Sequence, residues 1–91
     1  MALDTTCDHD GSRLSFQITL EELDLFEPAF ATLERKTGNF IDPYGRAWIY
    51  PDHQKILVDA LAQNADVRVK AFRQFLETTI RMDAVLFAED D

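Results

Sequence analysis

The amino-acid sequence predicts a small α+β domain, in which a mostly antiparallel sheet carries helices on one face. The first of three observations that predict this class is that residues 13–19 alternate apolar and polar side chains, as a half-buried strand does. The second is a turn sequence between two short β-prone runs within residues 39–50. The third is that three other segments repeat apolar residues at the three- and four-residue steps of an amphipathic helix. Because 91 residues support a single core, they predict one domain.

The first strand is expected over residues 13–19, and a helix follows it directly. Thr19 and Glu22 have the spacing of a capping box, in which a hydroxyl and a carboxylate satisfy free backbone amides. Pro28 removes a backbone donor inside this helix, so a kink or break is expected just before it. Gly38 is expected to end the helix in the left-handed conformation. The apolar stripe of the helix consists of Leu23, Phe26, Phe30 and Leu33.

The turn between the two β-prone runs predicts a hairpin over residues 39–50. The sequence Asp-Pro-Tyr-Gly at 42–45 fits a type I turn, because proline fixes φ at the second position while Asp and Gly suit the first and fourth. Alternation places Trp48 and Tyr50 on one side of the second arm and the smaller Ala47 on the other. If the smaller side is buried, Trp48 and Tyr50 are exposed together; the alternative is that Trp48 belongs to the core.

Two further helices and a last strand complete the expected domain. Pro51 and Asp52 start the first of these helices, since proline suits the first turn and a carboxylate suits the positive end of the helix dipole. Asp66 is expected to cap the second. The segment 84–88 favours a strand because it is β-prone, with an extension of the helix as the alternative. The expected organisation is a flexible polar tail over 1–12, the domain over 13–88 and an acidic end over 89–91.

The net charge of −8 comes from seventeen Asp and Glu against nine Lys and Arg. This acidity argues against nucleic acid as a partner, because binding phosphates needs a concentrated basic patch. It favours a basic protein, since an acidic surface accelerates encounter with a cationic target. The alternative is that the charge only keeps a small domain in solution. The sequence has neither an apolar run of about 18 residues nor the features of a secretion signal, so we expect a cytoplasmic protein with no membrane partner.

No catalytic, metal or cofactor site is predicted. Residues 7–10, Cys-Asp-His-Asp, invite a metal interpretation, but zinc needs about four ligands, usually as two spaced pairs, and no second group follows. His53 is a second candidate, because Asp42 or Asp52 could orient it as a general base. The alternative is a first-turn histidine that packs on the hairpin. Neither a nucleophile elbow nor a glycine-rich phosphate loop occurs, and the chain is expected not to be an enzyme.

A protein-binding surface is therefore the expected function. Aromatic side chains supply contact area at the centre of an interface, and charged side chains around them set its register. The candidates are carboxylates of the first helix, together with aromatic, acidic and histidine side chains in and after the hairpin. They are Glu21, Glu22, Asp24, Glu27, Asp42, Tyr44, Trp48, Tyr50, Asp52 and His53.

The segment "TGNFIDPYGRAWIYPDHQKIL", residues 37–57, resembles a core of small acidic bacterial proteins of unassigned role. In length and charge the whole chain is similar to immunity proteins, the cognate inhibitors of antibacterial toxins. The resemblance implies a cytoplasmic, non-enzymatic protein that occludes the active site of a basic toxin with acidic and aromatic side chains. One alternative is a homodimeric structural or regulatory subunit that buries the hairpin edge or residues 84–88. Another is a small ligand-binding or hydrolytic domain centred on His53.

Overall fold

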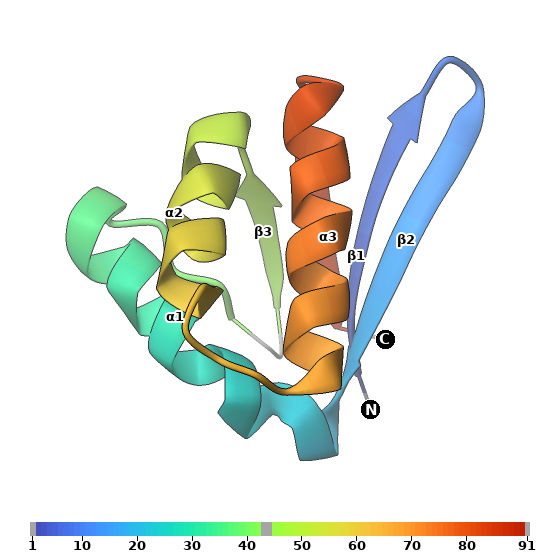
Figure 1. Cartoon of the computed structure of the whole chain (residues 1–91). Coiled ribbons are helices and arrows are strands. Elements are labelled where there is room, and N and C mark those ends of the chain that lie inside the picture. Colours follow the sequence, from blue (N-terminus) through green and yellow to red (C-terminus); the bar gives the residue numbers. More distant parts are fainter. Residues whose placement is uncertain (1, 43–44, 91) are drawn as a thin grey trace.

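The computed structural model describes residues 2–42 and 45–90. In these residues an antiparallel sheet of four strands carries three α-helices on one face (Figure 1). The strands are β1 (Ala2–His9), β2 (Ser12–Thr19), β3 (Arg46–Ile49) and β4 (Leu86–Asp90), in the order β2-β1-β4-β3. The helical elements are the 3₁₀ turn η1 (Leu20–Glu22), α1 (Leu23–Thr37), α2 (Pro51–Leu61) and α3 (Val67–Arg81). The predicted α+β class, with helices on one face of an antiparallel sheet, is confirmed.

The N-terminal residues form a strand inside the sheet, so the flexible tail expected over residues 1–12 is wrong for the described part of that segment. β1 pairs with β2 along its whole length and with β4 on its other side. Asp10 and Gly11 connect β1 to β2 with φ angles of 51° and 79°, as a two-residue type I′ turn requires. The buried Thr5 hydroxyl donates to the Phe16 carbonyl at 2.7 Å. A strand bonded on both edges is held in place by its neighbours.

β3 pairs with β4, so the hairpin expected over residues 39–50 is wrong. Four residue pairs join the two strands, from Arg46 with Glu89 to Ile49 with Leu86. β4 is already paired with β1 and offers β3 three apolar residue pairs, whereas the run at 39–41 has only two apolar residues. The pairing of strands distant in the sequence therefore overrides the local signal of the turn.

The turn at 42–45 and the C-terminal strand lie close to expectation. The Gly45 N–H donates to the Asp42 carbonyl at 3.1 Å, while Pro43 and Tyr44 lie outside the described residues. The strand predicted from segment 84–88 is confirmed as β4, but it begins at Leu86 and continues through residues 89 and 90. These two residues, expected to form a separate acidic end, therefore belong to the sheet. One domain spans the described chain rather than residues 13–88 alone.

α1 runs continuously through Pro28, so the break expected just before this residue is wrong. The irregularity lies earlier, where η1 gives way to α1 at Leu23. Pro28 deprives the Asp24 carbonyl of its helical donor, and this carbonyl is in the exposed first turn, where water can replace the donor. Gly38 ends the helix as predicted, with a φ of 80° and its N–H bonded to the Glu34 carbonyl at 2.8 Å.

A buried amide joins the start of α2 to β3 and α3. The Gln54 side chain is fully buried, and its Nε2 donates to the carbonyls of Ile49 and Ala84 at 2.8 Å each. Its Oε1 accepts from the Thr79 hydroxyl at 2.6 Å. This network places the first turn of α2, which carries His53, against the end of β3.

Candidate protein-binding surface

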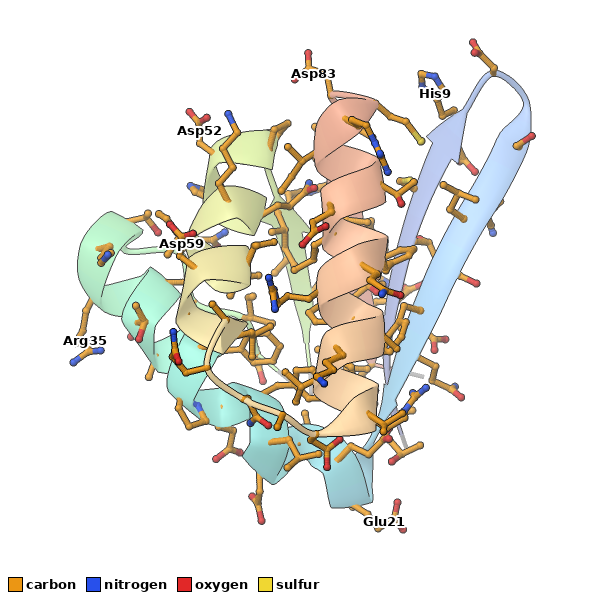
Figure 2. All side chains as sticks on the ribbon, viewed as in Figure 1. His9, Glu21, Arg35, Asp52, Asp59 and Asp83 are labelled. Atoms are coloured by element: carbon orange, nitrogen blue, oxygen red, sulfur yellow. The ribbon has the colours of Figure 1, made fainter. Side chains whose placement is uncertain are left out.

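Four carboxylates follow the exposed side of η1 and α1. They are exposed because the apolar stripe of α1 buries the opposite side of the helix. Glu21 projects away from the fold at the lower edge of Figure 2. Among the described residues, none of the four forms an ion pair. We call this set the acidic row; its members are Glu21, Asp24, Glu27 and Glu34.

Ion pairs neutralise carboxylates on other elements. The pairs are Arg13 with Asp8 at 3.1 Å, Lys55 with Asp52 at 3.8 Å and Arg73 with Glu77 at 3.7 Å. Asp59 and Asp83 are exposed but lie on separate parts of the chain, well apart in Figure 2. On the open face of the sheet, Glu89 is paired in register with Arg46 as well as with Asp4. Along the consecutive elements η1 and α1, the acidic row is thus the longest run of carboxylates without an ion pair in the described chain.

Glu22, one of the predicted binding residues, is held in an ion pair within the fold. Arg68, at the start of α3, donates to both oxygens of the Glu22 carboxylate and to the Gln17 carbonyl. The guanidinium also lies over the Phe16 ring, 4.6 Å from its centroid. The hydrogen bond from Arg68 lowers the pKa of Glu22, and the Thr19 N–H adds to this effect. Glu22 therefore fixes α3 against the start of α1 and contributes no net charge to the surface.

Replacing Arg68 with Ala is expected to lower the free energy of unfolding by about 1 kcal/mol at neutral pH. The value is modest because the Arg68 side chain is 44% exposed and water screens the ion pair. The pKa of Glu22 is lower in the folded than in the unfolded state, so its contribution is present above the unfolded value. It is lost as pH falls through the folded value. Urea unfolding of the unmodified protein and of the Arg68→Ala variant, at pH 7 and at about pH 3, measures this contribution to stability. The difference in free energy of unfolding between the two proteins should be smaller at acid pH. Arg81→Ala serves as the control on the same helix. A difference that does not depend on pH would contradict the role of the Arg68–Glu22 ion pair.

Three exposed aromatic side chains surround a hollow beside β3. Phe40, Trp48 and Tyr50 are 57%, 56% and 51% exposed. Together with His53 they line an open hollow of about 470 Å³, which we call the aromatic hollow. The Asn39 amide donates to the Trp48 carbonyl at 3.0 Å and so holds the segment after α1 against β3. The exposure of Trp48 follows from its alternation with the buried Ala47 and Ile49, which settles the alternative left open by the sequence.

His53 does not have the surroundings of a general base. The Asn39 amide lies 3.0 Å from Nδ1 and can only donate, so Nδ1 accepts. A catalytic imidazole is usually oriented the other way, with Nδ1–H donating to a carboxylate or carbonyl behind it. His53 also contacts the Tyr50 ring, whose centroid is 5.6 Å from that of the imidazole. Both contacts fit a positioned surface side chain and give the hydrolytic alternative no support.

The structure brings together only some of the predicted binding residues. Trp48, Tyr50 and His53 share the aromatic hollow, whereas Asp52 is exposed beside Lys55 and Asp42 is half-buried near the turn. Tyr44 lies outside the described residues. Two residues of the surface were missed, Glu34 and Phe40. Glu34 lies about two helical turns after Glu27 and so on the same side of α1, and this spacing could have identified it. No sequence pattern indicates Phe40, because its exposure depends on tertiary packing.

Neither a metal centre nor a membrane helix is present in the part of the chain that the structure describes. Residues 2–42 and 45–90 contain no group of three or more His, Cys, Asp or Glu side chains able to hold a metal ion. No helix formed by these residues is long and apolar enough to cross a bilayer.

The fold and this surface define a small α+β protein with an acidic helix and an aromatic hollow. No family model matches the sequence, and no curated protein matches it. The structure is similar to the solved structure of a Neisseria DNA mimic protein, DMP12, with a TM-score of 0.73 and 14% sequence identity. The match covers 98% of this chain and 99% of that one, so the two proteins share a fold over nearly their full lengths.

This comparison contradicts the toxin domain expected from the sequence as the basic partner. The protein with this fold is titled a DNA mimic rather than a toxin inhibitor. The resemblance to immunity proteins is not tested by these comparisons and stays a prediction.

Proposed function

We propose that this chain is a non-enzymatic binding module that occupies the DNA-binding surface of a DNA-binding protein. The observation that carries the proposal is the acidic row, Glu21, Asp24, Glu27 and Glu34, which is exposed and unpaired within the described residues. The fold shared with a protein titled a DNA mimic supports it. The net charge of −8 supports it as well, because a cationic DNA-binding surface attracts an acidic protein from a distance.

The geometry of the acidic row suits a set of cations that bind phosphates. At about 1.5 Å of rise per residue, the row extends over roughly 20 Å, with a mean spacing of about 6 to 7 Å between carboxylates. Phosphates on one strand of B-DNA are about 3.4 Å apart along the axis. The row therefore offers about half the charge density of a single strand. The row can pair with a few Lys and Arg side chains of a partner, but its charge alone gives a lower affinity than a DNA duplex has for the same cations.

The proposal is tested by displacement of DNA. The immobilised chain is incubated with a nuclease-treated extract of the native host, and a retained DNA-binding protein is identified and purified. Fluorescence anisotropy then follows a labelled duplex bound to that protein while the chain is added. We expect the anisotropy to fall to that of free DNA, since both ligands need the same cations. A duplex that stays bound at saturating chain would refute the proposal, as would an extract that yields no DNA-binding protein.

A further inference from the structure

A groove runs between α1 and the segment that follows Gly38. Its volume is about 360 Å³, and its walls are mostly apolar. Phe30 and Ile41 are 8% and 2% exposed, whereas Phe40 is 57% exposed. The residues that line the groove are Leu23, Glu27, Phe30, Ala31, Phe40, Ile41 and Glu34.

The groove is accessible because α1 has a small side chain at the position that faces it. Ala31 is exposed and contributes only a methyl group to the wall. A larger side chain at this position would occupy the groove without altering the charge or the buried stripe of α1. The groove can therefore be closed by one substitution at an exposed helical site.

Two carboxylates flank this apolar surface. Glu27 and Glu34 belong to the acidic row and also line the groove, and their positions on α1 are about 10 Å apart along the helix axis. Neither forms an ion pair within the described chain. Arg35 is the nearest cation in sequence, but it projects away from the fold in Figure 2 and donates to the Thr32 hydroxyl at 3.0 Å. The groove thus combines an apolar wall with a negative rim.

We propose that this groove binds an apolar side chain that lies between two basic residues of the DNA-binding partner. The proposal rests on the proposed function and specifies part of the partner's chemistry. The negative rim selects the flanking cations, because Glu27 and Glu34 form no ion pair with any of the described residues. In an extended segment of the partner, the two residues that flank a central residue are about 7 Å apart. Lys or Arg side chains are long enough to span from there to Glu27 and Glu34, whose positions are about 10 Å apart along the helix axis.

The groove would supply the affinity that the sparse acidic row lacks. Burying one large apolar side chain corresponds to roughly 10- to 100-fold in affinity. This gain does not depend on charge, so it persists as salt rises, whereas the contacts of the acidic row weaken. The partner would then be selected by its apolar residue and attracted by its cations.

The test uses the full chain and two fluorescein-labelled peptides, Lys-Arg-Phe-Arg-Lys and Lys-Arg-Gly-Arg-Lys. Fluorescence anisotropy should show that the Phe peptide binds at least tenfold more tightly than the Gly peptide. Ala31→Leu should remove this preference, because leucine fills the groove. Ala60→Leu, the same change at an exposed position of α2, should retain it. Replacing both Glu27 and Glu34 with Gln should weaken both peptides and leave their ratio unchanged.

Three results would overturn the proposal. The first is equal binding of the two peptides, and the second is a preference for the Phe peptide that survives Ala31→Leu. The third is a dimer in sedimentation that Ala31→Leu abolishes, because this would place a second copy of the chain in the groove. Thermal unfolding followed by circular dichroism checks that Ala31→Leu remains folded. If the peptides bind equally while DNA is still displaced from the partner, the groove proposal fails and the proposed function stands. If the Phe preference is found but DNA is not displaced, the groove binds an apolar side chain between cations, and the proposed function fails.

Discussion

Replacing Gln54 with Leu is expected to lower the free energy of unfolding by about 3 kcal/mol, because it leaves buried carbonyls without their donor. The Gln54 amide donates to the carbonyls of Ile49 and Ala84, and its oxygen accepts from Thr79. Leucine has a similar size but no donor, and an unsatisfied buried acceptor costs about 1 to 3 kcal/mol. Urea unfolding followed by tryptophan fluorescence measures the change, with Trp48 as the reporter.

Gln74→Leu is the matched control for this substitution. Gln74 is exposed on α3, so the same chemical change there should alter stability by no more than about 0.5 kcal/mol. If the two variants lose similar stability, the buried network does not hold β3, α2 and α3 together. The outcome matters for the surface, because Tyr50 and His53 lie between Ile49 and Gln54 and depend on this junction.

Neutralising three members of the acidic row is expected to weaken binding to the DNA-binding partner by roughly 10- to 100-fold. The variant combines Asp24→Asn, Glu27→Gln and Glu34→Gln, which keep the shape of each side chain and remove its charge. Each contact between a carboxylate and a cation contributes on the order of 0.5 to 1 kcal/mol, so the three together account for this range. Isothermal titration calorimetry with the purified partner measures it. The slope of log affinity against log salt should also become shallower, since fewer charges are neutralised in the complex.

A second triple variant separates the location of the charges from their number. Asp59→Asn, Glu77→Gln and Asp83→Asn change the net charge by the same amount on α2, on α3 and after α3. Asp83 has a φ of 53°, a conformation that Asn tolerates. This control should lose no more than a few-fold in affinity. Equal losses in the two triple variants would show that net charge, rather than the acidic row, governs binding.

The sequence was sufficient for the elements whose signals are local. The apolar stripe of α1, its end at Gly38, the proline start of α2 and the Asp66 cap of α3 are all found as predicted. The Asp66 carboxylate accepts from the Arg68 N–H at 2.8 Å, as a capping residue should. Each of these features depends on residues within about one helical turn of one another.

The errors have identifiable physical causes. The sequence of β1 carried a readable signal, since the β-prone Leu3, Thr5 and Cys7 alternate with more polar residues before Asp10-Gly11, and Asp-Gly is one of the two strongest dipeptides for a two-residue hairpin. The many polar residues of that segment favour a flexible tail, and this prediction is wrong because β1 pairs with both β2 and β4. The partner of β3 had no local signal, because β4 follows it only after two helices. Pairing across such a distance is decided by the whole sheet.

The binding surface was predictable only in part. The acidic side of α1 follows from helical periodicity, and the exposure of Trp48 follows from alternation once Ala47 and Ile49 are known to be buried. The groove and the aromatic hollow both require that Phe40 stand beside α1 and β3. That arrangement results from the packing of an irregular segment, which no periodic pattern describes.

The proposed function requires that the chain and DNA compete for one surface of the partner. The most direct measurement is the apparent dissociation constant of the complex between the chain and its DNA-binding partner, determined at increasing concentrations of unlabelled duplex. Competition predicts that this constant rises in proportion to the duplex concentration, without a limit. A constant that does not change, or that rises to a plateau, would mean that chain, partner and DNA form a ternary complex, and it would contradict the account.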